Sequence, residues 1–104
     1  MKFLALEHDA PAAAASNFQP HLKAEAARVW ELYQAGTIRE LYFRPDLHTA
    51  VLVLECASAA EAHQSLDTLP LVRAGLITFE VIPLEAYSGF SRLFEKPLAP
   101  GPAS

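Results

Sequence analysis

The chain has 104 residues, 52% of them hydrophobic and 19% charged, with a formal net charge of −4 at neutral pH. That length suits one domain with a modest core, and the apolar content exceeds what so small a domain can bury alone, so we expect surface shared with a partner subunit. The eight lysines and arginines form no basic cluster, which argues against a nucleic-acid partner, and Cys56, the only cysteine, excludes an internal disulfide and a cysteine-built zinc site.

The beginning of the chain, "MKFLALEHD", predicts a strand over Lys2 to Glu7. Its apolar run is too short for a signal peptide, and no longer stretch has the length and hydropathy to span a bilayer. We therefore expect a soluble, cytoplasmic protein with no membrane partner.

A loop over "HDAPAAAAS" precedes a predicted helix over "FQPHLKAEAARVWELYQAG". Asn17 is a suitable N-cap, Pro20 falls in the first turn, and Gly36 stands where a left-handed residue ends a helix. One apolar stripe recurs at helical spacing through Leu22, Ala26, Val29 and Tyr33.

Two further strands are predicted over "TIRELYFR" and "TAVLVLEC", joined by a turn over "PDLH". Ser58 and Glu61 have the spacing of a capping box, which opens a second helix reaching to about Leu69. A bend over "PLVRAG" leads into the last strand, "LITFEVIPLEA".

The resulting order βαββαβ predicts an α+β fold, a ferredoxin-like sandwich with a four-stranded antiparallel sheet and two helices on one face. Alternation should make the uncovered face polar, yet Val51 and Val53 share a strand with Leu52 and Leu54, so both faces are apolar. Two sheets packed face to face would resolve this. We therefore expect a homodimer that forms a dimeric α/β barrel, with higher assembly left open.

The two faces of the sheet can be separated by alternation. The set expected to face the helices is Leu4, Leu6, Leu41, Phe43, Leu52, Leu54, Ile77, Phe79 and Val81. The set expected to face a chamber between two sheets is Ala5, Glu7, Ile38, Glu40, Tyr42, Arg44, Val51, Val53, Thr78 and Glu80. A register error of one residue would reverse the assignment of a strand.

The segment "AGTIRELYFRPDLHTAVLVLECASAAEAHQSLDTLPLVRAGLITFEVIPL" resembles the muconolactone isomerase-like group of dimeric α/β barrel proteins. The likeness is carried by the A-G-T-x-R-x-L-aromatic run at 35–42, the S-x-x-E opening of the second helix and "LPLVRAG", and it extends over residues 1–84. The resemblance implies a cofactor-free isomerase that moves a proton within an unsaturated lactone or an aromatic-derived acid. It places Arg39 at an anion-facing or structural position. Such chemistry needs a general base and a donor for the developing enolate.

The first predicted helix also resembles that of YciI-like proteins, which carry a histidine early in this helix and an aspartate near its end. His21 matches the first position, whereas Gln34 stands at the second, where an acid is expected. His21 and Glu25, at i and i+4, could form an oriented base, although the same spacing is typical of a solvated helix flank, which we favour.

Alternating residues of the second strand form the other candidate site. Arg44 could hold a substrate carboxylate, Tyr42 donate a hydrogen bond, and Glu40 or Glu80 act as the base. The equally weighted alternative is a Glu–Arg pair on an exposed edge strand. His8 ends the first strand, where loops line the cavity mouth, and four histidines without tight spacing predict no metal site.

The end of the chain divides into an aromatic arm at 87–95 and a Pro-rich tail at 96–104 that we expect to be disordered, after a domain at 1–86. We expect the arm to dock on a neighbouring subunit or to cover the cavity mouth. Two functions rival the isomerase: a non-catalytic ligand-binding or assembly module, and a cofactor-free monooxygenase. Each of them takes a small organic ligand.

Overall fold

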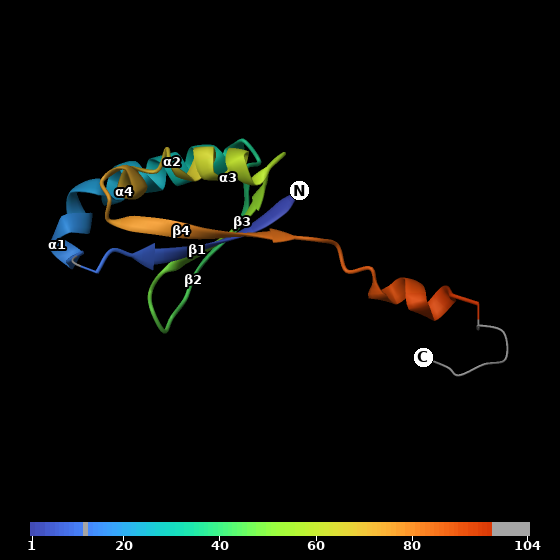
Figure 1. Ribbon diagram of the computed structural model, residues 1–104. Coiled ribbons are helices and arrows are strands. Elements are labelled where there is room, and N and C mark those ends of the chain that lie inside the picture. Colours follow the sequence, from blue (N-terminus) through green and yellow to red (C-terminus); the bar gives the residue numbers. More distant parts are fainter. Residues whose placement is uncertain (12, 97–104) are drawn as a thin grey trace.

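The computed structural model describes residues 1–11 and 13–96 and contains one four-stranded antiparallel sheet in the order β2-β3-β1-β4. The strands are β1 (Lys2–Asp9), β2 (Ile38–Phe43), β3 (Ala50–Glu55) and β4 (Ile77–Leu84). The helices are α1 (Ala15–Phe18), η1 (Gln19–His21), α2 (Leu22–Gln34), α3 (Ala59–Leu66), α4 (Pro70–Arg73) and η2 (Gly89–Phe94). Because α2, α3 and α4 lie on one face of the sheet (Figure 1), the predicted ferredoxin-like α+β fold is confirmed.

The first predicted helix is divided into α1, η1 and α2. Asn17 does not cap α2, because its Oδ1 accepts the Ala14 amide at 3.0 Å in the preceding turn. Pro20 lies within η1 and has no N–H to continue an α-helical ladder, which accounts for the break. Gly36 ends α2 as predicted, with φ of 81° and with the Thr37 amide donating to the Leu32 carbonyl at 3.0 Å.

The second helix begins at the predicted cap. The Glu61 amide donates to Ser58 Oγ at 3.1 Å, and Glu61 Oε2 accepts the Ala57 amide at 3.2 Å. The helix ends at Leu66, and the predicted bend that follows contains one further helical turn, α4.

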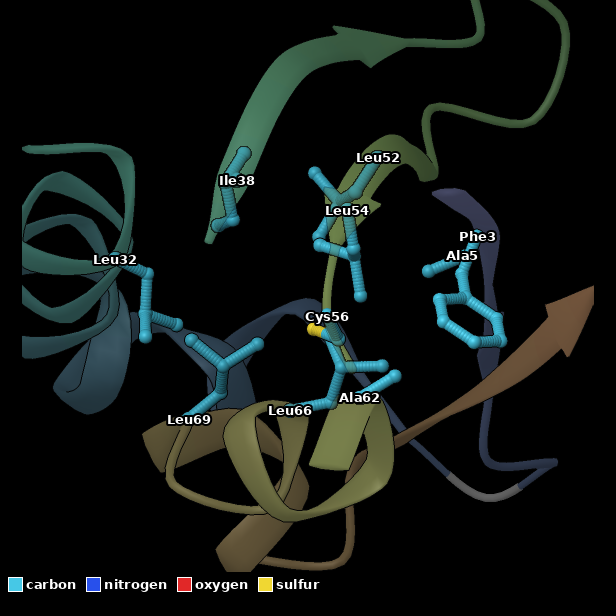
Figure 2. Packing of buried hydrophobic residues seen from close by; sticks show 10 residues of the cluster. All are labelled: Phe3, Ala5, Leu32, Ile38, Leu52, Leu54, Cys56, Ala62, Leu66 and Leu69. Atoms are coloured by element: carbon cyan, nitrogen blue, oxygen red, sulfur yellow. The ribbon is translucent and has the colours of Figure 1, made fainter. Parts of the chain in front are cut away.

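The core lies between the sheet and the helices, where side chains of β1, β2 and β3 meet those of α2 and α3 (Figure 2). Its buried members are Phe3, Ala5, Leu32, Ile38, Leu52, Leu54, Cys56, Ala62, Leu66 and Leu69.

Strand β1 has the opposite orientation to the predicted one. Phe3 and Ala5 are 1% and 0% exposed, so the prediction that Leu4 and Leu6 face the helices was wrong. Both phases of this strand are apolar, and the larger ring of Phe3 takes the core position. Glu7 consequently lies on the helix-covered face.

A β-bulge changes the phase of β2. Ile38 pairs with Leu54 and is buried, whereas Glu40 pairs with Val53 on the opposite face, which leaves Arg39 as the extra residue. The predicted chamber position of Ile38 was therefore wrong. The other strand residues keep their predicted phase: Leu41, Phe43, Leu52, Leu54, Ile77, Phe79 and Val81 lie on the helix side.

The opposite face of the sheet carries apolar side chains in β1, β3 and β4, namely Leu4, Leu6, Val51, Val53 and Ile82. No helix of the described residues covers this open face (Figure 1). Beyond β4 the chain leads away from the sheet to η2. In this arm Tyr87, which precedes η2, and Phe90, Leu93 and Phe94 of η2 are 66–84% exposed. The predicted tail lies, from residue 97 on, outside the described residues.

Within the described residues, no helix has both the length and the apolar character needed to cross a membrane.

Candidate functional site

A large open cavity separates part of α2 from the sheet. Its volume is about 1050 Å³, which is slightly above the roughly 300–1,000 Å³ typical of small-molecule sites. Leu41 and Phe43 face the helix layer but are 41% and 68% exposed, because this cavity lies above them. The wall from α2 consists of Leu22, Glu25, Ala26, Val29, Trp30 and Tyr33. The sheet and its hairpin contribute Glu7, Asp9, Leu41, Tyr42, Phe43, Leu47, His48, Ala50, Leu52 and Phe79.

Glu7 is the titratable group with the largest perturbation in this cavity. It is half-buried on β1, and its Oε1 accepts the Ala50 amide of β3 at 3.1 Å. Burial, a hydrogen bond with the Asp9 side chain, and the negative charges of Asp9 and Glu25 raise the pKa of Glu7 to about 7, although the Ala50 amide opposes the rise. A carboxyl group with this pKa can both take and return a proton at neutral pH.

Glu25 enters the cavity from the opposite wall. Its Oε1 accepts the Leu71 amide of α4 at 2.9 Å, which fixes the side chain between two helices. Burial raises the pKa of Glu25, against the effects of the Leu71 amide and the charge of His21. With Asp9, which lies two residues beyond Glu7 on the same face of β1, three carboxyl groups line the cavity.

His48 lies on the cavity rim in the turn between β2 and β3. Its φ of 55° is in the left-handed region, which non-glycine residues adopt uncommonly. The turn is closed by hydrogen bonds from the His48 amide to the Arg44 carbonyl at 2.7 Å and from the Arg44 amide to the Thr49 carbonyl at 2.8 Å. The His48 ring stacks on Phe43, with centroids 5.2 Å apart and an interplanar angle of 8°. These contacts hold an imidazole beside the cavity.

The outer part of the α2 wall is aromatic. Trp30 and Tyr33 are both exposed, and their rings stack with centroids 5.9 Å apart. Flat aromatic and aliphatic surfaces with a few carboxyl groups are suited to a small, mostly apolar ring compound.

Tyr42 is the one residue of the predicted site that borders this cavity. Its hydroxyl donates to Glu40 Oε1 at 2.7 Å, and this hydrogen bond and the charge of Glu40 raise the pKa of Tyr42. Arg44 does not join the pair, since its Nε and Nη2 donate to Asp46 at 3.1 and 2.7 Å.

The other predicted residues lie elsewhere. His8 Nε2 and Glu80 Oε1 are 3.3 Å apart, both exposed on the open face. His21 ends η1 beside Glu25 but is not part of the cavity lining. Arg39 donates from Nε to the Gly36 carbonyl at 2.6 Å, which ties the bulge to the end of α2.

Sequence reasoning did not select Glu7, Asp9 or His48 as site residues, and it favoured a solvated surface for Glu25. A usable signal was present in β1. Phe3, Ala5, Glu7 and Asp9 alternate on one face, so two acids continue the stripe that enters the core. Acids in the buried phase of a strand are rare unless they are paired or functional.

Within residues 1–11 and 13–96, no group of three or more His, Cys, Asp or Glu side chains could hold a metal ion.

Comparison with known proteins gives one family and several similar structures, among them a muconolactone isomerase and a dehydrochlorinase. The model of the muconolactone delta-isomerase family matches residues 3–89. No curated protein sequence matches the chain.

The two structures share the fold at low sequence identity. A muconolactone isomerase crystal structure is 22% identical with a TM-score of 0.67, covering 85% of this chain and 92% of that chain. The 5-chloro-2-hydroxyhydroquinone dehydrochlorinase of Burkholderia phenoliruptrix, in complex with 2,5-dihydroxybenzoquinone, is 20% identical with a TM-score of 0.66, covering 86% of this chain and 98% of that chain. Since the family model spans most of its length, the chain belongs to the muconolactone delta-isomerase family.

Proposed function

We propose that the protein is a cofactor-free isomerase that moves a proton within a small unsaturated lactone or aromatic-derived acid. The observation that carries the proposal is Glu7, a half-buried carboxyl group with a pKa of about 7 in a cavity lined mainly by apolar side chains. Membership of the muconolactone delta-isomerase family supports the reaction class.

In the proposed reaction, ionised Glu7 removes a proton from a carbon of the lactone ring. The electrons of that C–H bond move into the ring, the double bond shifts, and negative charge develops on the carbonyl oxygen. While the proton is on the Glu7 carboxyl group it can exchange with solvent. Glu7 then delivers a proton to a different carbon, so that no proton is gained or lost overall. A group with a pKa near 7 suits both steps.

We also propose a homodimer in which two open faces pack together and the aromatic arm at 87–95 contacts the neighbouring subunit. The apolar residues of the open face and the exposed side chains of η2 support this arrangement, because surfaces of this kind are usually covered. Such packing would enclose the Glu40–Tyr42 and His8–Glu80 pairs between the sheets. It would thereby create a second possible site, to which Arg39 and His21 do not belong.

Deuterium exchange distinguishes these two sites. The protein would be incubated in D₂O with muconolactone and related unsaturated lactones, and deuterium entering the substrate would be followed by NMR. We expect Glu7→Gln to abolish exchange and Glu40→Gln to retain it. The opposite pattern would move the base to the open face.

A ligand-binding module without catalysis is the second candidate, favoured by the size and apolar character of the cavity. It predicts saturable binding of a lactone without deuterium exchange at any pH.

A further inference from the structure

We propose that the cavity selects an uncharged ring compound, such as a lactone ester, and discriminates against a ligand that carries a carboxylate. This inference rests on the proposed function for the position of the site, and it narrows the substrate class. It is carried by the distribution of charge around the cavity.

All charged residues that line the cavity are acidic. Glu7 and Asp9 extend from β1 and Glu25 from α2, so negative charge approaches a bound ligand from two walls. A ligand carboxylate there would lose hydration and meet charge of its own sign in a partly apolar site, and both effects disfavour it.

None of the chain's eight lysines and arginines is among the described residues of the lining. Several of them are engaged elsewhere. Arg44 binds Asp46, Arg28 donates to Thr68 Oγ1 at 2.9 Å, and Lys2 Nζ lies 3.7 Å from Glu55 Oε1. Within residues 1–11 and 13–96, no lysine or arginine therefore lies in the cavity wall to bind a ligand carboxylate.

His48 is the basic group nearest to the ligand space, and it stacks on Phe43 at the rim. The groups whose charge acts on Glu7 are Asp9 on its own strand and Glu25 on α2, and His21 acts on Glu25. When pH falls through 7, Glu7 takes up a proton and the repulsion of a carboxylate decreases.

A matched pair of ligands, muconolactone and its methyl ester, tests the inference. They share the ring and differ by one charge. Trp30, the only tryptophan, lines the cavity, so its fluorescence reports binding of either ligand without requiring catalysis. At pH 8 we expect the ester to bind the full-length protein at least about tenfold more tightly than the carboxylate. Between pH 8 and 6 the affinity for the carboxylate should rise, while that for the ester should stay constant.

A charge-removing substitution and a matched control sharpen the test. Glu25→Gln keeps an oxygen for the Leu71 amide but removes the charge, and it should strengthen carboxylate binding by roughly threefold to tenfold without changing ester binding. Glu31→Gln lies on the same helix, with its side chain 62% exposed and outside the lining, and should change neither affinity.

Equal or tighter binding of the carboxylate would overturn the inference, as would failure of the ester to bind. The first of these results is expected if a neighbouring subunit supplies a cation such as Arg92 of the exposed arm. Selective binding of the ester without deuterium exchange would support the ligand class and refute the isomerase. If both ligands bind with equal affinity and both take up deuterium, the isomerase is supported and the proposed ligand class is refuted.

Discussion

The two halves of the helix-covered face are built from the same strands but differ in filling. In the packed half, Phe3 and Leu54 meet Leu66 and Leu69, and each of these side chains is at most 2% exposed. In the hollow half, the same face of β1 continues with Glu7, and α2 lies across an open cavity. One strand therefore supplies stability at one end and perturbed titratable groups at the other.

This contrast has a physical basis. Filling the hollow half with apolar side chains would increase the buried area and the stability, but it would remove the space for a ligand. Conversely, the unfavourable burial of Glu7 is tolerated because the packed half stabilises the strand that carries it.

The largest expected effect is loss of catalysis in the hollow half. Glu7→Gln should lower the rate of proton exchange by roughly 10²–10⁴-fold, because a general base is removed. In the wild type, the rate should rise with pH and reach half its maximum near pH 7, where Glu7 ionises. Asp9→Asn should move this midpoint to lower pH, because the Asp9 hydrogen bond and charge help to raise the pKa. An unchanged midpoint would show that another group is the base.

In the packed half, truncation should reduce stability more than in the hollow half. Leu66→Ala should lower the free energy of unfolding by about 2–5 kcal/mol, since the residue is fully enclosed. Leu41→Ala should cost less than about 1 kcal/mol, because the side chain already faces the cavity. Urea denaturation of both variants measures the difference, and similar losses would contradict the division into two halves.

Stability should also depend on pH through Glu7. Its pKa is raised from 4.5 to about 7 in the folded protein, so the folded state binds more protons than the unfolded state between these values. The free energy of unfolding should fall as pH rises through this window, by about 1–2 kcal/mol after allowance for the half-exposed position. Comparing Glu7→Gln with wild type at pH 5 and pH 8 isolates this contribution. The prediction is contradicted if Glu7→Gln, compared with wild type, has no higher free energy of unfolding at pH 8 than at pH 5.

The smallest expected effect concerns the N-terminal caps of the two long helices, α2 and α3. In the packed half, α3 has a side-chain cap from Ser58, whereas α2, beside the cavity, has no side-chain cap at His21. Ser58→Ala should therefore cost about 1 kcal/mol and His21→Ala clearly less. Thermal unfolding of the two variants measures this loss. Equal shifts in Tm would show that the caps of the two helices do not differ in strength.

The elements with local signals were predictable from the sequence. Gly36 ends α2 and Ser58 caps α3 because both depend on chemistry within a few residues. The fold followed from the order of these elements and from the handedness of their connections.

The orientation of β1 and the phase of β2 were not predictable in the same way. Leu4 and Phe3 are both apolar, so alternation alone cannot decide which of them enters the core. The bulge at Arg39 depends on pairing with a strand that is distant in the sequence. The error in β1 placed Glu7 on the wrong face, and the cavity, which depends on the position of α2, was missed with it.

The bulge at Arg39 also affects how copies of this chain can meet. Strand β2 is at an edge of the sheet, where unpaired backbone groups could recruit an identical strand from another molecule. The extra residue interrupts a regular ladder, and the charged Arg39 side chain lies folded against the end of α2. Pairing of β2 with the same strand of another copy, and a filament growing through this edge, are thereby disfavoured.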